Sequence, residues 1–303
     1  MHAKQINEKA LDFLSKQNWG EAQNLFFYNA KHNPTHETYN NLGFYLITEG
    51  LLCKNGRTRN ALKLGIKYLL KSESIKASFI NICAITKSID YQLREEHSDK
   101  KRLYVCACEY LKKGLAKEYS NVLQYNLLRF SYLLTPQDIE LSIQANHLLK
   151  KFPCRESVLL YFELLRAHNL MEAGLECISK YKIFLDEIEL IMFYSKFGLY
   201  EQGYNLCKSV YNMFSIDEFV ASAIIECCVN TNHLIEAEKY AIQIKQNEKD
   251  MNPHYKADWC SKIVGDSIEC VNYRKDRVQN YHFCPPIIET CCYFGCPVHK
   301  TVW

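Results

Sequence analysis

Residues 19–34 read WGEAQNLFFYNAKHNP, and this stretch decides the fold of the chain. Its small and apolar residues recur at intervals of three and four positions, which places on one helix face Ala22, Leu25, Phe26 and Ala30. Pro34 cannot continue a helix and ends the segment. The stretch therefore predicts one amphipathic helix whose apolar face needs a neighbouring helix to cover it.

The residues before this stretch predict that neighbour. Between positions 6 and 14 a second apolar face is formed by Ile6, Ala10, Phe13 and Leu14. Gln17 and Asn18 interrupt the pattern between the two helices. Two helices of about 14 residues joined by so short a turn form an antiparallel hairpin.

Similar helix pairs recur farther along the chain. Residues 154–169 (CRESVLLYFELLRAHN) pair with 170–184, residues 185–198 (LDEIELIMFYSKFG) with 199–214, and residues 217–230 (DEFVASAIIECCVN) with 233–247. The second helices align at Glu172, Glu201 and Glu236, which lie 29 and 35 residues apart. Periods of this size are typical of stacked helix pairs, in which each pair buries its apolar face against the next. The small residues that are predicted to let these helices approach closely are Ala22, Ala173 and Ala237.

Residues 6–34 resemble a tetratricopeptide repeat. Ala22 and Phe26 match the small and the aromatic packing positions of its second helix, and Pro34 closes the unit. The next segment, TYNNLGFYL, contains Leu42 and Gly43 and resembles the first helix of a following repeat. Residues 158–247 match more weakly, and residues 50–150 depart from the period, for example in the long helical segment SDKKRLYVCACEYLKKGLAKEY.

The resemblance implies an all-α fold, a right-handed superhelix of stacked antiparallel helix pairs. It also implies a concave groove that binds a protein or peptide partner. We predict that this repeat domain covers residues 1–250 and that residues 251–303 form a separate cysteine-rich segment. The composition changes at that boundary, because four of the seven prolines and six of the fifteen cysteines follow it.

Charge and hydropathy exclude several classes of partner and location. The formal net charge of +3 gives no basic footprint for nucleic acid. No apolar run reaches the length of about 20 residues that a membrane span needs. The N-terminus, MHAKQINEKALDFL, lacks the features of a signal peptide. These observations predict a cytoplasmic protein that binds neither nucleic acid nor membrane.

The cysteines outside the last segment are predicted to pack as small apolar residues. Cys106 and Cys108 lie two positions apart on a predicted helix, so their side chains point about 200° apart and cannot chelate one ion. The adjacent Cys227 and Cys228 have the same interpretation. No catalytic residue and no phosphate-binding loop is predicted anywhere in the chain.

The cysteine-rich segment is the one place where the sequence indicates chemistry. A Cys-x3-Cys-x2-His run and one upstream cysteine give a tetrahedral zinc set of Cys284, Cys292, Cys296 and His299. Cys291 can replace Cys292 in this set, and an arrangement of four cysteines and two histidines that includes Cys260 and His282 also stays open. Core packing of these cysteines, disulfide bonds and a modified or redox-active tail stay open as alternatives.

Three functions follow from these expectations. The first is a scaffold or adaptor that binds a protein or peptide in its groove, with a zinc-stapled C-terminal segment. The second is a peptide-responsive regulator that closes around a short peptide. The third is a metal-dependent enzyme that uses the C-terminal Cys/His cluster. The scaffold is preferred because no catalytic constellation is present in the repeats.

Overall fold

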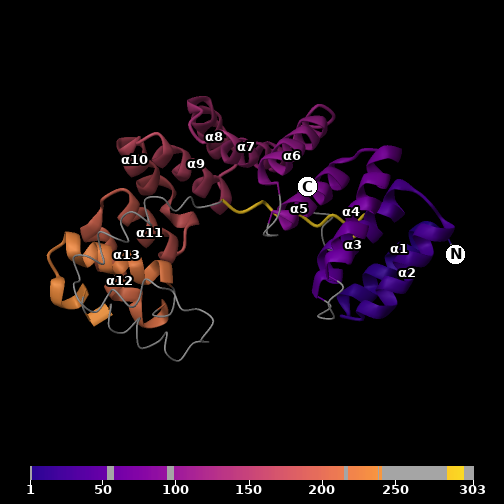
Figure 1. Ribbon diagram of the computed structural model, residues 1–303, viewed down its shortest axis with the longest axis horizontal. Coiled ribbons are helices and arrows are strands. Elements are labelled where there is room, and N and C mark those ends of the chain that lie inside the picture. Colours follow the sequence, from indigo (N-terminus) through magenta and orange to yellow (C-terminus); the bar gives the residue numbers. More distant parts are fainter. Residues whose placement is uncertain are drawn as a thin grey trace. The chain divides into compact units, whose positions relative to one another are not determined.

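The structure is a computed structural model, and it describes residues 2–52, 58–93, 99–214, 218–237, 239–240 and 285–296. All regular elements in this described part are helical, which confirms the predicted all-α class. The chain divides into two compact units (Figure 1). Unit 1 comprises Met1–Pro136 and Pro286–Trp303, and unit 2 comprises Gln137–Pro285.

Each unit is a series of helices. Unit 1 contains α1 (Ala3–Ser15), α2 (Trp19–His32), α3 (His36–Leu52), α4 (Thr58–Ile75), α5 (Phe79–Gln92), α6 (Lys100–Leu115) and α7 (Asn121–Leu134). Unit 2 contains α8 (Ile139–Lys151), α9 (Arg155–Ala167), α10 (Met171–Tyr181), a 3-10 turn (Lys182–Phe184), α11 (Glu187–Lys196), α12 (Tyr200–Phe214) and α13 (Glu218–Asn230).

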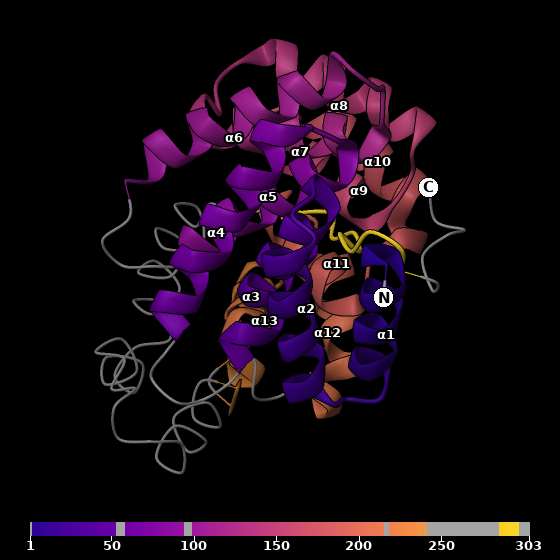
Figure 2. The same ribbon diagram turned by 90° about the vertical axis from the view of Figure 1, so that its right-hand side faces the viewer.

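Within unit 1 every helix packs against the next one in the chain, and in unit 2 the same holds for α8 with α9, α9 with α10, α11 with α12 and α12 with α13. Figure 2 shows α1, α2 and α3 of unit 1 lying side by side. The predicted helix pairs are present up to α13, whereas the last predicted helix, residues 233–247, lies outside the described residues except for 233–237 and 239–240. Residues 58–134, where the repeat period fails, also fold into consecutive packed helices. The irregular spacing there reflects helices of unequal length, from 14 to 18 residues, and does not reflect a different architecture.

The same type of turn joins the two helices in each of four pairs. A residue with positive φ follows the first helix in each case: Gln17 (58°), Asn169 (54°), Gly198 (70°) and Asn232 (63°). The next residue donates its backbone N–H to a carbonyl five residues earlier, as Asn18 does to Phe13 at 2.9 Å. This is the Schellman motif that ends a helix through one left-handed residue. The break predicted at Gln17 and Asn18 is therefore confirmed.

Each second helix carries a small residue five positions after that left-handed residue. These small residues are Ala22, Gly174, Gly203 and Ala237. A Cβ atom on Gly174 would lie 2.2 Å from the Phe197 ring, so the absence of a side chain lets α11 approach α10. The sequence pattern had indicated Ala173 for this position, but Ala173 is only half-buried and its neighbour Gly174 makes the contact.

Other sequence expectations about packing are met. Ala22 and Phe26 are buried on α2, and Leu42 is buried on α3. Cys227 and Cys228 lie in the core of unit 2, where they pack with Ala237. No described helix has both the length and the apolar character that crossing a bilayer requires.

Candidate functional site

The most informative feature of unit 1 is a segment that is not helical. Residues 285–296 follow α3, α5 and α7 without regular secondary structure, and we call this segment the strap. Figure 1 shows it as the yellow trace that passes α5 and α3. Buried asparagines on the three helices face it or support it: Asn40, Asn41, Asn81 and Asn126. We call this surface the asparagine face.

Two asparagines of α3 bind the backbone of the strap. The Asn41 carboxamide accepts a hydrogen bond from the Phe294 backbone N–H at 2.8 Å. It also donates one to the Phe294 carbonyl at 3.0 Å. Asn40 donates to the carbonyl of Cys292 at 2.7 Å. Asn41 thus satisfies both backbone groups of Phe294, which lies in a turn with Gly295 and has no helix or strand to pair them.

Asn81 orients one of these groups from the next helix. Its Nδ2 atom on α5 donates to Asn40 Oδ1 at 3.3 Å and to the Leu69 carbonyl of α4 at 3.1 Å. Because Asn81 holds the Oδ1 atom of Asn40, the Nδ2 atom of Asn40 is directed at the strap. The two carboxamides therefore act as one buried network.

Helix α7 holds the other end of the strap. The Tyr125 hydroxyl donates to the Pro286 carbonyl at 2.6 Å. Asn126 accepts from the Ile288 backbone N–H at 3.2 Å. Between the two ends, Lys87 of α5 forms an ion pair with Glu289 at 3.1 Å. Helices α3, α5 and α7 thus bind the strap along its length.

Side chains of the strap add two apolar anchors. The Tyr293 ring stacks on Phe26 at a centroid distance of 5.7 Å and meets Phe44 edge-on at 4.8 Å. Its hydroxyl lies 3.4 Å from Thr48 Oγ1. Cys292 is 1% exposed and lies in the core cluster that contains Cys83. The strap is therefore part of the hydrophobic core of unit 1.

The described thiols of the strap fall into two neighbourhoods. Burial raises the pKa of Cys292 well above its ordinary value, and the nearby Cys83 raises it further. The Cys292 thiol donates to the Thr290 carbonyl at 3.3 Å. Burial also raises the pKa of Cys291 to about 11, and Cys291 interacts with the Cys296 thiol. The neighbour of Cys296 is therefore Cys291.

This arrangement bears on the predicted zinc ligands. Cys292 and Cys296 are described, whereas Cys284 and His299 lie outside the described residues. No three potential ligands converge within the described part of the chain. If Cys296 binds a metal, its side-chain neighbour favours Cys291 as a second ligand, because the Cys292 thiol is directed into the core. This choice between adjacent cysteines is the one that the sequence left open.

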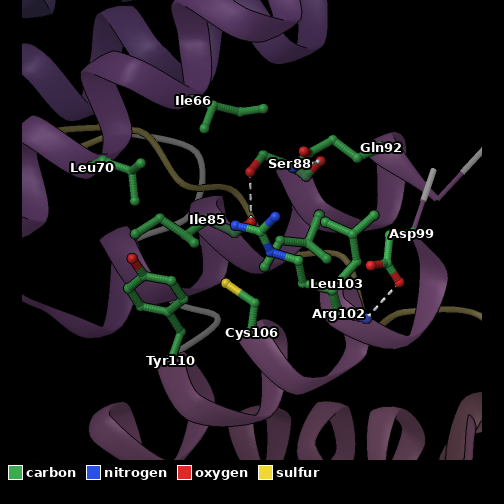
Figure 3. A pocket seen from close by; sticks show the side chains of 11 residues that line it. Ile66, Leu70, Ile85, Ser88, Gln92, Asp99, Arg102, Leu103, Cys106 and Tyr110 are labelled. Atoms are coloured by element: carbon green, nitrogen blue, oxygen red, sulfur yellow. Dashed lines mark hydrogen bonds between the residues drawn. The ribbon is translucent and has the colours of Figure 1, made fainter. Parts of the chain in front are cut away.

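A pocket in unit 1 lies between α4, α5 and α6 (Figure 3). It has a volume of about 460 Å³, and its mostly apolar lining includes Arg102, Cys106 and Tyr110 of α6. Ile85 and Ile89 line it from α5, on the side of that helix opposite to the strap contacts. Cys106 is thus half-buried at a pocket, whereas Cys108 is in the core as predicted.

The asparagine face was not anticipated from the sequence. In the segment TYNNLGFYL the resemblance to a repeat rests on Leu42 and Gly43. The two residues before them, Asn40 and Asn41, make the hydrogen bonds to the strap. Compared with models of known protein families and with curated proteins, the sequence matches none of them.

Proposed function

We propose that the chain is a tetratricopeptide-like scaffold that binds an extended segment of a protein partner on the asparagine face of unit 1. The observation that carries the proposal is the two-way hydrogen bonding of Asn41 with the backbone of Phe294. A surface that binds backbone amides of an extended chain can accept many side-chain sequences. The Schellman turns and the small residues that follow them support a repeated, superhelical stacking with a concave inner surface.

The test compares partner sets by affinity capture from the native cells. The baits are the full-length chain, an Asn41→Ala variant and a matched Asn24→Ala variant, because Asn24 is exposed on α2. Each bait is also prepared with Tyr293→Ala, which weakens the strap contacts. We expect at least one partner to be retained by Asn24→Ala and lost by Asn41→Ala. If Asn41→Ala and Asn24→Ala captured identical partner sets, both with and without Tyr293→Ala, the proposal would be contradicted.

A peptide-responsive regulator is the second proposed function. It is favoured by the strap itself, because a segment of the chain already lies on the surface that we assign to partners. A partner peptide then has to displace the strap, and this exchange couples binding to a change in the chain. We also propose a reducing location such as the cytoplasm, which is supported by the cysteines that pack as buried apolar residues, among them Cys83, Cys177 and Cys207.

The zinc ligands are proposed with one change. The set becomes Cys284, Cys291, Cys296 and His299, supported by the contact between the Cys291 and Cys296 thiols. Zinc would close the last residues of the chain as a structural staple. Metal quantification on the purified chain tests this with a matched pair, Cys291→Ser and Cys292→Ser. Loss of one zinc per chain in Cys291→Ser, Cys296→Ser and His299→Ala, but not in Cys292→Ser, is expected. An unchanged metal content in these variants would reject the set.

A further inference from the structure

We infer that the strap is an internal ligand: it occupies the asparagine face in the free protein and reports the pattern of the partner segment that replaces it. This inference rests on the proposed function and specifies the partner. The partner is an extended peptide with a buried aliphatic residue, an acidic residue two positions later and a tyrosine four positions after the acid. In the strap these positions are Ile287, Glu289 and Tyr293.

The first argument concerns which atoms of the strap are bound. The hydrogen bonds between the strap and the asparagines of α3 and α7 all involve the strap backbone, at Ile288, Cys292 and Phe294. Tyr125 likewise binds the backbone at Pro286. Backbone contacts do not depend on the side chains of the bound segment. A peptide from another chain can therefore follow the same path.

The second argument concerns the side chains that give selectivity. Ile287 is 8% exposed, so an aliphatic side chain is required at that position. Lys87 is largely buried beside Glu289 and favours a carboxylate there. Lys87 also lies 5.6 Å from the centroid of the Phe44 ring, the ring that Tyr293 meets edge-on. Lys87 and Phe44 thus lie in contact and together bind the acidic and the tyrosine side chains of the segment.

The third argument concerns the strength of the strap contacts. Each hydrogen bond of this kind and each aromatic pair contributes only modestly to the free energy of strap binding. The strap is bound by these contacts together with the burial of Ile287 and Cys292, and a peptide that supplies the same groups can replace it. A tethered segment competes at an effective concentration on the order of millimolar. When the strap segment has an intrinsic dissociation constant of about 10 μM for the face, the strap weakens a competing peptide about 100-fold.

The probe is a fluorescein-labelled synthetic peptide, PIIETCCYFG (residues 286–295), under reducing conditions. Fluorescence anisotropy is measured with full-length wild type and with two strap variants, Tyr293→Ala and Glu289→Lys. The second variant changes an exposed carboxylate and preserves the core, so it serves if Tyr293→Ala fails to fold. Tyr119→Ala is the matched control, because Tyr119 is exposed and far along the chain from the strap.

The strap variants should bind the peptide at least tenfold more tightly than wild type and Tyr119→Ala. Adding Asn41→Ala to a strap variant should remove that gain. Equal affinity of wild type and both strap variants would overturn the internal-ligand inference and leave the binding face intact. No binding to either strap variant would overturn the inferred partner pattern, while the affinity capture would still decide whether the face binds proteins.

The Cys292 thiol gives an independent measurement, because it is 1% exposed with the strap docked and displacement of the strap should expose it. Its alkylation by a maleimide, followed by mass spectrometry, should be slow in wild type and fast in Glu289→Lys. Saturating peptide should accelerate it in wild type. Slow alkylation under all three conditions would contradict displacement of the strap. A wild-type dimer formed by exchanged straps, detected by light scattering, would overturn occupancy within one chain.

Discussion

Replacing Glu163 by glutamine should destabilise unit 2 strongly. Glu163 on α9 is fully buried, and its two carboxylate oxygens contact different cations. One oxygen lies 2.8 Å from Lys196 Nζ on α11, and the other accepts from Arg166 Nε at 3.0 Å. Lys196 is 4% exposed, so the pair joins α9 to α11 with almost no access to water. Glutamine retains the shape of the side chain and removes only its charge.

The expected loss is about 3–5 kcal/mol, the cost of removing one partner from a buried ion pair. In a domain of this size each kcal/mol lowers the unfolding midpoint by about 2–4 °C, so a fall of about 10 °C is expected. Guanidinium unfolding followed by circular dichroism measures the free energy, and hydrogen exchange locates the loss in α9 and α11. A double variant, Glu163→Leu with Lys196→Met, should recover part of the loss because it also removes the buried ammonium group.

The pH dependence provides a sharper check. Burial lowers the pKa of Lys196 below its ordinary value, although Glu163 opposes this effect. In Glu163→Gln the pKa must fall further, because the opposing carboxylate is gone. A lysine whose folded pKa lies below its unfolded value destabilises the fold at lower pH, and this penalty fades as the pH rises toward the unfolded pKa. The deficit of the variant should therefore be smaller at pH 10 than at pH 7. A deficit below about 1 kcal/mol at pH 7, or one that grows with pH, would refute the reasoning.

Two further predictions concern packing and thiol reactivity. Gly174→Ala should cost about 1–3 kcal/mol in unfolding free energy, because the added Cβ meets the buried Phe197 ring at 2.2 Å. Gly20→Ala, in a helical position with nothing within 4 Å, should instead stabilise by about 0.5–1 kcal/mol, and an equal effect of the two changes would contradict the close helix approach. Cys106 should react with iodoacetamide faster than Cys83, because Cys106 is half-buried whereas burial raises the pKa of Cys83 to about 12. Both rates should rise with pH as the thiolate fractions grow, and mass spectrometry that found Cys83 modified first at pH 8 would be inconsistent with its place in the core.

The sequence predicted the helix pairs because their signal is local. Apolar spacing and the breaks at Gln17 and Pro34 depend on a few neighbouring residues, and the helices end where these signals occur. The one-residue misplacement at Ala173 arose because two small residues are adjacent, and only the Phe197 ring distinguishes Gly174 from its neighbour. Periodicity alone does not reveal which small residue faces the next helix.

The candidate site had no such local signal. The strap binds Asn40 and Asn41 from more than 250 positions away, and no short-range pattern encodes that contact. An asparagine in the middle of a helix indicates only a polar position of low helix propensity. The segment that pairs with its carboxamide has to be known before its burial can be explained. The cysteine-rich composition identified the segment as unusual, but its extended backbone, which the asparagines bind, leaves no compositional trace.

The position of the strap in the chain also sets the order in which the site is assembled. A ribosome completes α3, α5 and α7 before it reaches Pro286, and synthesis at about 5–20 residues per second leaves on the order of 10 s between these events. During that interval the nascent helices are able to fold while the segment that covers them does not yet exist. A partner present at translation would meet a vacant surface, whereas one that arrives later must compete with the finished chain. The same two proteins would then associate at different rates during and after synthesis.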